Sequence, residues 1–335
     1  MTQGQVREDV AVETKARFGV LQARRLRLHS WIIAYGGTLL LLIACGVVSP
    51  SFVSPGNILA QLAIGSFLGL AATGQMLVIL TGGIDLSLPW TLNVVAILVT
   101  NLTLGSDRRL IWALPLALAI ALIVGLVNGL GVAYLRVHPV VMTLGMNFVL
   151  QGASLVYTNG SPQGVTPKSV LFLGGGKIAG FPVAILLFAL VAVGATLLLQ
   201  RSGLGRAIYA VGNNAWVAYL AGINTRRTLV WAYVLAALCS GLAGLAFVGY
   251  AGQSYLGMGD AFLFPAITAV VLGGTDILGG AGSYAGTIGG VLFVTFLQAL
   301  MTIIAVPQAG KNIIYGLLVL VLTFAYRLSR SRIGE

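Results

Sequence analysis

Six neutral polar side chains interrupt the long apolar runs of this sequence. Each carries an amide or hydroxyl that can exchange hydrogen bonds with a neutral polar ligand. Thr143, Asn147 and Gln151 are spaced four residues apart, so on a helix they form one row. Such groups also link membrane helices to one another, and this alternative stays open for each of them. The six candidates are Gln75, Asn93, Asn128, Thr143, Asn147 and Gln151.

Ionisable and nucleophilic groups are scarce. Between residues 14 and 334 the acids are Asp85, Asp107, Asp260 and Asp276, and all four fall in predicted loops. We therefore expect no buried carboxylate of the kind that ion-coupled transporters use. The two histidines and two cysteines lack metal-ligand spacing, and no G-x-x-x-x-G-K-[ST] phosphate loop is present. The sequence predicts no metal site and no nucleotide hydrolysis by this chain.

Two short words share a Gly-Gly-x-Asp pattern, TGGIDLS at 81–87 and LGGTDILGG at 272–280, and each follows an aliphatic run. Paired glycines favour a tight turn at a helix end, and aspartate can cap the backbone N–H groups that follow. The repetition indicates two related halves, with chance similarity as the alternative. We expect both words to form loops or a gate on one side of the membrane. The matching residues are Gly82, Gly83 and Asp85, and Gly273, Gly274 and Asp276.

A polar, basic segment, RSGLGRAIYAVGNNAWVAYLAGINTRR at 201–227, stands between two hydrocarbon-like runs. Asn213 and Asn214 are suitable helix N-caps, and Gly222 suits the position after a helix end. Trp216 and Tyr219 offer broad apolar area to a partner. The alternative is a solvated basic connector with no partner.

The composition indicates which secondary structure must position these residues. The chain has 335 residues, of which 58% are hydrophobic and 8% charged, with mean hydropathy +0.98. Soluble domains carry about 25% charged residues, so the sequence predicts an all-α polytopic membrane protein. The eighth of its apolar segments is short enough to be a half-helix. The ten segments are 31–49, 58–80, 88–105, 111–135, 139–157, 181–200, 229–250, 262–274, 284–305 and 312–326.

Positive charge indicates the orientation. If the N-terminus is cytoplasmic, lysines and arginines divide 14 inside to 5 outside, which favours both termini in the cytoplasm. The basic charge then reflects topology and calls for no nucleic acid. We expect cytoplasmic tails at 1–30 and 327–335, a membrane domain at 31–326, and a cytoplasmic loop at 201–228.

Three of these words, GGIDLS, GRAIYAVGNNAWVAYLAGINTRR and GGTDILGGAGSYAGTIGG, resemble in order and spacing the permease subunits of bacterial ATP-binding-cassette importers for monosaccharides. The resemblance covers about residues 31–326. It departs at Leu88-Pro89-Trp90, where members commonly read Val-Gly-Ser, although proline suits a helix start. It places the ATPase-coupling contacts at Gly205, Arg206, Asn213, Asn214, Trp216, Tyr219, Gly222 and Asn224.

The resemblance implies a non-enzymatic, multi-pass subunit of the bacterial inner membrane. Its implied partners are a second permease chain, cytoplasmic ATPase subunits that bind ATP and Mg²⁺, and a periplasmic sugar-binding protein. The chain itself would hold no cofactor. The neutral polar row would then line the sugar path. The alternatives are a branched-chain amino-acid permease of the same superfamily and a stand-alone facilitator.

Overall fold

The computed structural model describes residue 32 and residues 34–331, and within them the chain is almost entirely helical. The predicted tail at 1–30 and the last four residues of the tail at 327–335 lie outside the described residues. Helices of the first half are α1 (Ala34–Val48), η1 (Pro50–Val53), α2 (Pro55–Leu80), α3 (Leu88–Thr103), α4 (Asp107–Ala133), α5 (Pro139–Thr158) and α6 (Lys168–Gly175).

A small antiparallel hairpin, β1 (Lys177–Ile178) and β2 (Phe181–Pro182), then leads into the second half. Its helices are α7 (Val183–Arg201), α8 (Gly203–Asn213), α9 (Ala215–Leu220), α10 (Thr225–Ala251), η2 (Asp260–Phe262), α11 (Leu263–Leu272), α12 (Tyr284–Ile303) and α13 (Gln308–Ser331).

The all-α class is confirmed, and each of the ten predicted segments coincides with an apolar helix. Among the described residues, six helices are long and apolar enough to cross a membrane: α2, α4, α5, α7, α10 and α12. The other four apolar helices are shorter, so ten crossings stays a prediction. The short eighth segment corresponds to α11, whose ten residues rise only about 15 Å.

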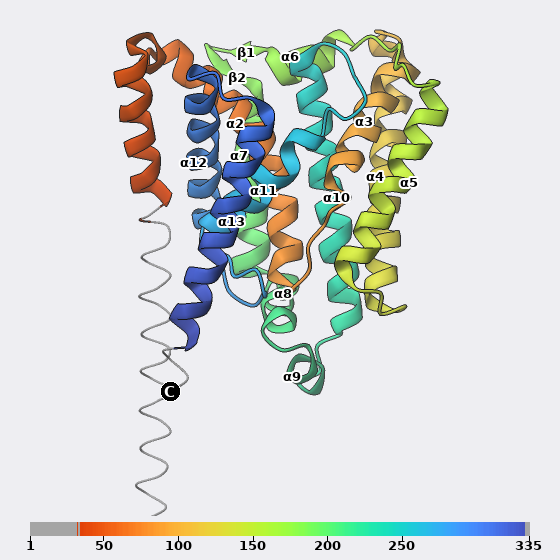
Figure 1. The fold of residues 1–335 in the computed structure, drawn as a ribbon. Coiled ribbons are helices and arrows are strands. Elements are labelled where there is room, and N and C mark those ends of the chain that lie inside the picture. The colour runs from red at the N-terminus through yellow and green to blue at the C-terminus, as the bar shows by residue number, and fades with distance from the viewer. Residues whose placement is uncertain (1–31, 33, 332–335) are drawn as a thin grey trace, which may run out of the picture.

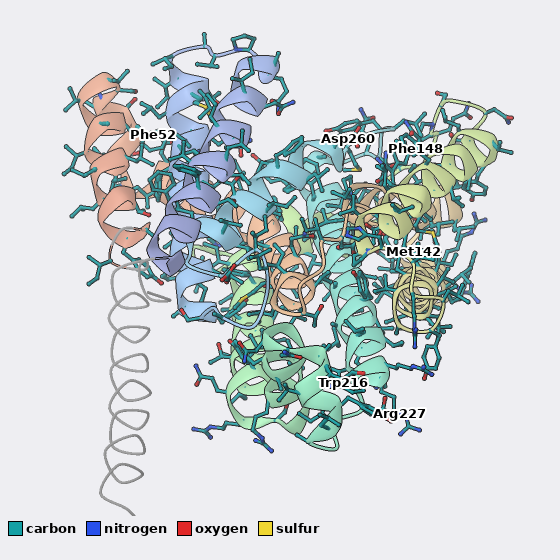
Figure 2. The ribbon with its side chains drawn as sticks, turned by 60° about the horizontal axis from the view of Figure 1, so that its bottom comes forward. Phe52, Met142, Phe148, Trp216, Arg227 and Asp260 are labelled. Carbon is teal, nitrogen blue, oxygen red and sulfur yellow. The ribbon has the colours of Figure 1, made fainter. Side chains whose placement is uncertain are left out.

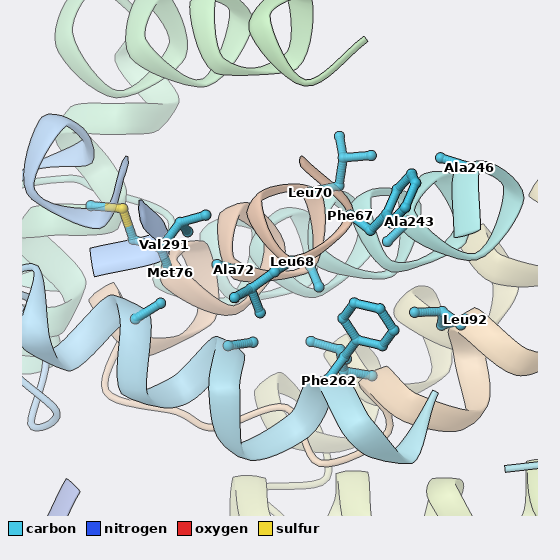
Figure 3. Packing of buried hydrophobic residues seen from close by; sticks show 14 of the residues in the cluster. Phe67, Leu68, Leu70, Ala72, Met76, Leu92, Ala243, Ala246, Phe262 and Val291 are labelled. Atoms are coloured by element: carbon cyan, nitrogen blue, oxygen red, sulfur yellow. The ribbon is translucent and has the colours of Figure 1, made fainter. Parts of the chain in front are cut away.

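Helix α2 is the centre of the molecule. From Gly65 to its end at Leu80 every residue is buried, and α7, α10, α11 and α12 pack around it (Figure 1). Phe67, Leu70 and Met76 of α2 meet Ala243 of α10 and Phe262 of η2 in one continuous apolar core (Figure 3). An all-round apolar helix of this kind is stable only when other helices cover every face.

Helices α4 and α10 pack with their backbones close together. Gly125 and Gly129 of α4 are one turn apart, and a Cβ on either would collide with the backbone of α10 at Tyr233 or Val230. Small residues at this spacing let membrane helices approach closely. The α4–α10 pair therefore forms a rigid wall beside α2.

Two connections interrupt the helical packing. Residues 81–87 leave α2 near α8 and rise to the start of α3, and residues 252–259 drop from the far end of α10 to η2 and α11 (Figure 1). Helices α8 and α9 extend beyond the bundle, and this side of the molecule is called the α9 end below.

Candidate functional site

The tip of the α9 end is an exposed apolar helix. Trp216 is 67% exposed and Tyr219 60% exposed, and Val217 and Leu220 beside them are also exposed. The rings of Trp216 and Tyr219 stack with their centroids 5.9 Å apart. Figure 2 shows Trp216 pointing away from the bundle, with Arg227 nearby at the same end. Because these side chains are exposed, they contribute little to the free energy of folding. An exposed apolar patch of this kind is typical of a protein–protein interface.

Local capping holds α9 rigidly. The Asn214 side chain accepts hydrogen bonds from the N–H groups of Trp216 (3.0 Å) and Val217 (3.1 Å), as predicted. Gly222 has φ +80°, and the N–H of Ile223 reaches the carbonyl of Ala218, which closes the helix as a Schellman turn. Asn213 is not an N-cap; it is the last residue of α8, because Asn214 takes the extended conformation that a cap requires.

The remaining predicted coupling residues also have local roles. Asn224 caps α10 by accepting from the N–H of Arg227 at 3.0 Å. Gly205 is buried where α8 crosses the carbonyl of Leu198 in α7, so a side chain there would push α8 away. Arg206 is exposed to solvent.

A groove of ≈ 860 Å³ lies beside α9, between it, the α4–α5 connection and the start of α10. Trp216, Tyr219 and Ile223 form one wall of the groove, and Arg136 and Arg226 supply positive charge. Arg226 also stacks over the ring of Tyr134 at 5.3 Å. The groove thus combines aromatic area with cations, and it suits an acidic, partly apolar segment of another protein.

The two Gly-Gly-x-Asp words meet each other and α8 at the base of this surface. The N–H of Gly280 donates to the carbonyl of Leu80 at 2.9 Å, and Gly279 lies against Gly82. Gly212 of α8 sits on the same Leu80 carbonyl, where no side chain fits. Backbone therefore contacts backbone from three elements, and we call this contact the glycine junction (Leu80–Gly82, Gly212–Asn213 and Leu278–Gly280).

The resemblance between the two words is partly confirmed. Asp85 Oδ1 accepts from the N–H of Ser87 at 2.8 Å, and Asp276 Oδ1 accepts from the N–H of Leu278 at 2.9 Å, so each caps the second N–H after it. The helix-ending glycine differs, because Gly82 has positive φ in the first word and Gly274 in the second. The two turns are related but one residue out of step, so the structure does not establish two repeated halves.

Asp85 contradicts the expectation that the chain buries no carboxylate. Asp85 is only 2% exposed, because hydrogen bonds hold the 81–87 connection against Asn128 of α4 and Thr143 of α5. Asp85 Oδ1 also accepts from the Ser87 hydroxyl (2.6 Å), and the Ser87 hydroxyl accepts from the Asn128 amide (2.9 Å). Thr143 accepts from the N–H of Leu86 at 3.0 Å. These bonds satisfy groups that would otherwise be costly to bury.

Three of the six predicted path residues therefore hold the 81–87 connection. Besides Asn128 and Thr143, the Gln75 amide lies against the backbone of Asp85. In the orientation that satisfies both ends of the amide, its nitrogen donates to the Asp85 carbonyl at 3.1 Å and its oxygen accepts from the Asp85 N–H at 3.3 Å. These three side chains use the hydrogen bonds named here within the protein, and their place in a solute path stays a prediction. Asn93 lies elsewhere, donating to the carbonyl of Tyr255 at 3.1 Å. Asn147 and Gln151 are partly buried on α5.

Replacing Asp85 with alanine should destabilise the protein, because the buried N–H and hydroxyl of Ser87 lose their shared acceptor. An unsatisfied buried donor costs about 1–3 kcal/mol, so we expect the Tm in detergent to fall by about 5 °C. Asp107→Ala is the matched control, since Asp107 accepts one bond, from the N–H of Ser169, at an exposed site. Equal Tm values for the two variants would contradict the assignment.

Comparison with known proteins identifies the family. The family described as "Branched-chain amino acid transport system / permease component" matches residues 57–323, most of the chain. The chain belongs to this family. The permease is 33% identical over 307 residues to the ribose import permease protein of Escherichia coli strain K12, covering 90% of this chain and 95% of that protein.

A second relative is the autoinducer 2 import system permease protein of Salmonella paratyphi A, which is 32% identical over 317 residues. That match covers 91% of this permease and 94% of the relative. No solved structure matches the chain significantly. The resemblance to permease subunits of ATP-binding-cassette importers is thus confirmed, and the permease is a multi-pass membrane protein.

The departure at Pro89-Trp90 leaves the fold intact. Pro89 lies in the first turn of α3, and Trp90 is buried with Val124 and Leu150.

Sequence reasoning missed one element of this site. Helix α8 was not expected as a separate element, although its residues alternate buried and exposed at helical spacing. Gly205, Ile208 and Val211 form its buried face.

Proposed function

We propose that this permease is the translocating subunit of an ATP-binding-cassette importer for a monosaccharide or a similarly small, hydroxyl-rich solute. The named activities of its ribose and autoinducer 2 relatives support the solute class, and their high coverage supports transfer of the whole-chain role. Both relatives are named as import permeases, whereas the amino-acid alternative rests on the family description alone.

The single observation that supports coupling best is the exposed apolar α9 joined to the glycine junction. A cytoplasmic ATPase that grips Trp216 and Tyr219 would move α8, and Gly212 on α8 touches the end of α2 directly. We propose that the α9 end is cytoplasmic, that the termini lie there, and that ATP and Mg²⁺ bind the ATPase. A second permease chain and an extracytoplasmic binding protein complete the proposed assembly.

Reconstitution tests this proposal. The permease, purified with the ATPase and binding protein that accompany it in its native membrane, should import radiolabelled ribose into vesicles only when ATP is supplied. Vesicles that hold the permease alone are the matched control. Uptake by the permease alone would favour the facilitator, and ATP-driven uptake of leucine in place of ribose would favour the amino-acid alternative.

A further inference from the structure

The connection between α10 and α11 enters the molecule along α3. The Ser254 hydroxyl shares a hydrogen bond with Thr100 (2.7 Å), and the carbonyl of Tyr255 accepts from Asn93 (3.1 Å). Gly259 then lies directly against the backbone of Pro89, where a side chain has no room. Thr100, Asn93 and Pro89 follow one another toward the start of α3, so the connection descends about 16 Å along this helix.

This descent places Asp260 well inside the length of the bundle. Pro89, beside Gly259, is 14 residues or about 20 Å below the last residue of α3. The depth from the α9 end follows from the hydrogen bond between Asn128 of α4 and Ser87, the residue before α3. Asn128 is five residues, or about 8 Å, before the last residue of α4, so the start of α3 lies about 8 Å inside that end. Asp260 was predicted in a surface loop; its neighbour Gly259 instead lies between these two limits.

Asp260 is also exposed at that depth. Tyr255 in the same connection is 49% exposed, and Phe264, four residues after Asp260, is 45% exposed. In the part of the chain that the structure describes, no hydrogen bond or ion pair to the Asp260 carboxylate is found. The oxygen Oδ1 of Asn93, which holds Tyr255, is buried and likewise without a partner among the described residues.

An exposed carboxylate at this depth needs a polar environment. Lipid is excluded by the cost of a charge in hydrocarbon. The elements around Asp260 offer no cation in this chain or in a second copy of it, since α3, η2, α11 and the connections at 81–87 and 252–259 contain no lysine or arginine. The groups that suit Asp260 are therefore neutral hydrogen-bond donors, such as water and a polar solute.

We propose that Asp260 lines the solute path and accepts hydrogen bonds from the hydroxyl groups of the passing solute, with Tyr255 and Phe264 as apolar walls. This inference rests on the proposed import of a hydroxyl-rich solute. A carboxylate accepts from two adjacent hydroxyls at once, and aromatic faces pack against the C–H side of such a solute. A half-helix that begins at a binding position inside the membrane is a recurrent transporter device.

Thiol labelling tests the position of Asp260 without knowledge of the solute. In the reconstituted full-length permease with Cys45 and Cys239 replaced by alanine, Asp260→Cys should react with a charged methanethiosulfonate reagent. Leu190→Cys, on a 71% exposed position in the middle of α7, is the lipid-facing control. We expect Asp260→Cys to react about tenfold faster or more, because thiolate forms only where water reaches it. Equal rates would overturn the assignment.

Uptake measurements test whether Asp260 accepts hydrogen bonds from the solute. In the assembled importer, Asp260→Asn should raise the KM for radiolabelled ribose about tenfold, since hydrogen bonds to a charged acceptor are the stronger ones. Asp107→Asn should leave the KM unchanged. A labelled Asp260→Cys with an unchanged KM in Asp260→Asn would overturn contact with the solute. If the wild-type importer takes up no ribose, the proposed solute fails, and the labelling result still decides whether Asp260 faces the path.

Discussion

Replacing Trp216 with alanine should leave the permease folded in the membrane while weakening its affinity for the ATPase by about thirtyfold. Trp216 contributes almost nothing to the core, because it is 67% exposed and its ring stacks on Tyr219, which is itself exposed. Exposed aromatic anchors of this kind contribute about 2 kcal/mol or more to the binding free energy of an interface. The Kd follows from titrating ATPase onto detergent-solubilised permease.

Trp112→Ala is the matched control for Trp216, since Trp112 is 50% exposed at the opposite end of the molecule, near the start of α4. It should keep the wild-type Kd. A second variant, Gly222→Pro, removes both the positive φ and the N–H that reaches the carbonyl of Tyr219 at 3.0 Å. It should also weaken binding. Wild-type Kd values for Trp216→Ala and Gly222→Pro together would refute α9 as the ATPase contact.

Gly212→Val should separate ATP hydrolysis from transport. Any side chain at Gly212 meets the carbonyl of Leu80, which already accepts from the N–H of Gly280 at 2.9 Å. Overpacking of this kind costs about 1–3 kcal/mol, and the least costly relief is to move α8 away from α2. Because α9 itself is unchanged, the ATPase should still bind. We expect uptake per ATP hydrolysed to fall about tenfold or more.

The control for this variant is Gly194→Val in α7, where an added Cβ meets no atom within 4 Å. It should retain the wild-type ratio of uptake to hydrolysis. The informative measurement is this ratio in vesicles, together with Tm, so that loss of fold is separated from loss of coupling. A wild-type ratio in Gly212→Val would mean that the glycine junction does not transmit the movement.

The features that the sequence predicts well are the local ones. Ten apolar segments were located because a membrane span has a fixed length and composition. The cap at Asn214 and the turn at Gly222 were predicted because each depends on the residue itself and two or three neighbours. The family followed from short words whose order and spacing persist.

The features that the sequence does not predict depend on distant parts of the chain. Asp85 and Asp260 both read as surface loop residues, because aspartate beside glycine is typical of exposed turns. Only the packing of α4 and α5 over one connection, and of α3 along the other, carries them inside. The glycine junction has no side-chain pattern at all, since its contacts are between backbones.

The meeting of two connections at the start of α3 has a consequence for leakage across the membrane. The 81–87 connection reaches it from the α9 end and the 252–262 connection from the other, and Gly259 rests on Pro89 where they meet. Two short connections therefore meet beside helices α4 and α10, which are each about 40 Å long. If the solute path runs past Asp260 as proposed, a displacement of one of these connections would be enough to open it. On the same proposal, the hydrogen bonds of Asp85, Asn128 and Thr143 would hold the 81–87 connection in place and so limit the escape of ions and metabolites between transport cycles.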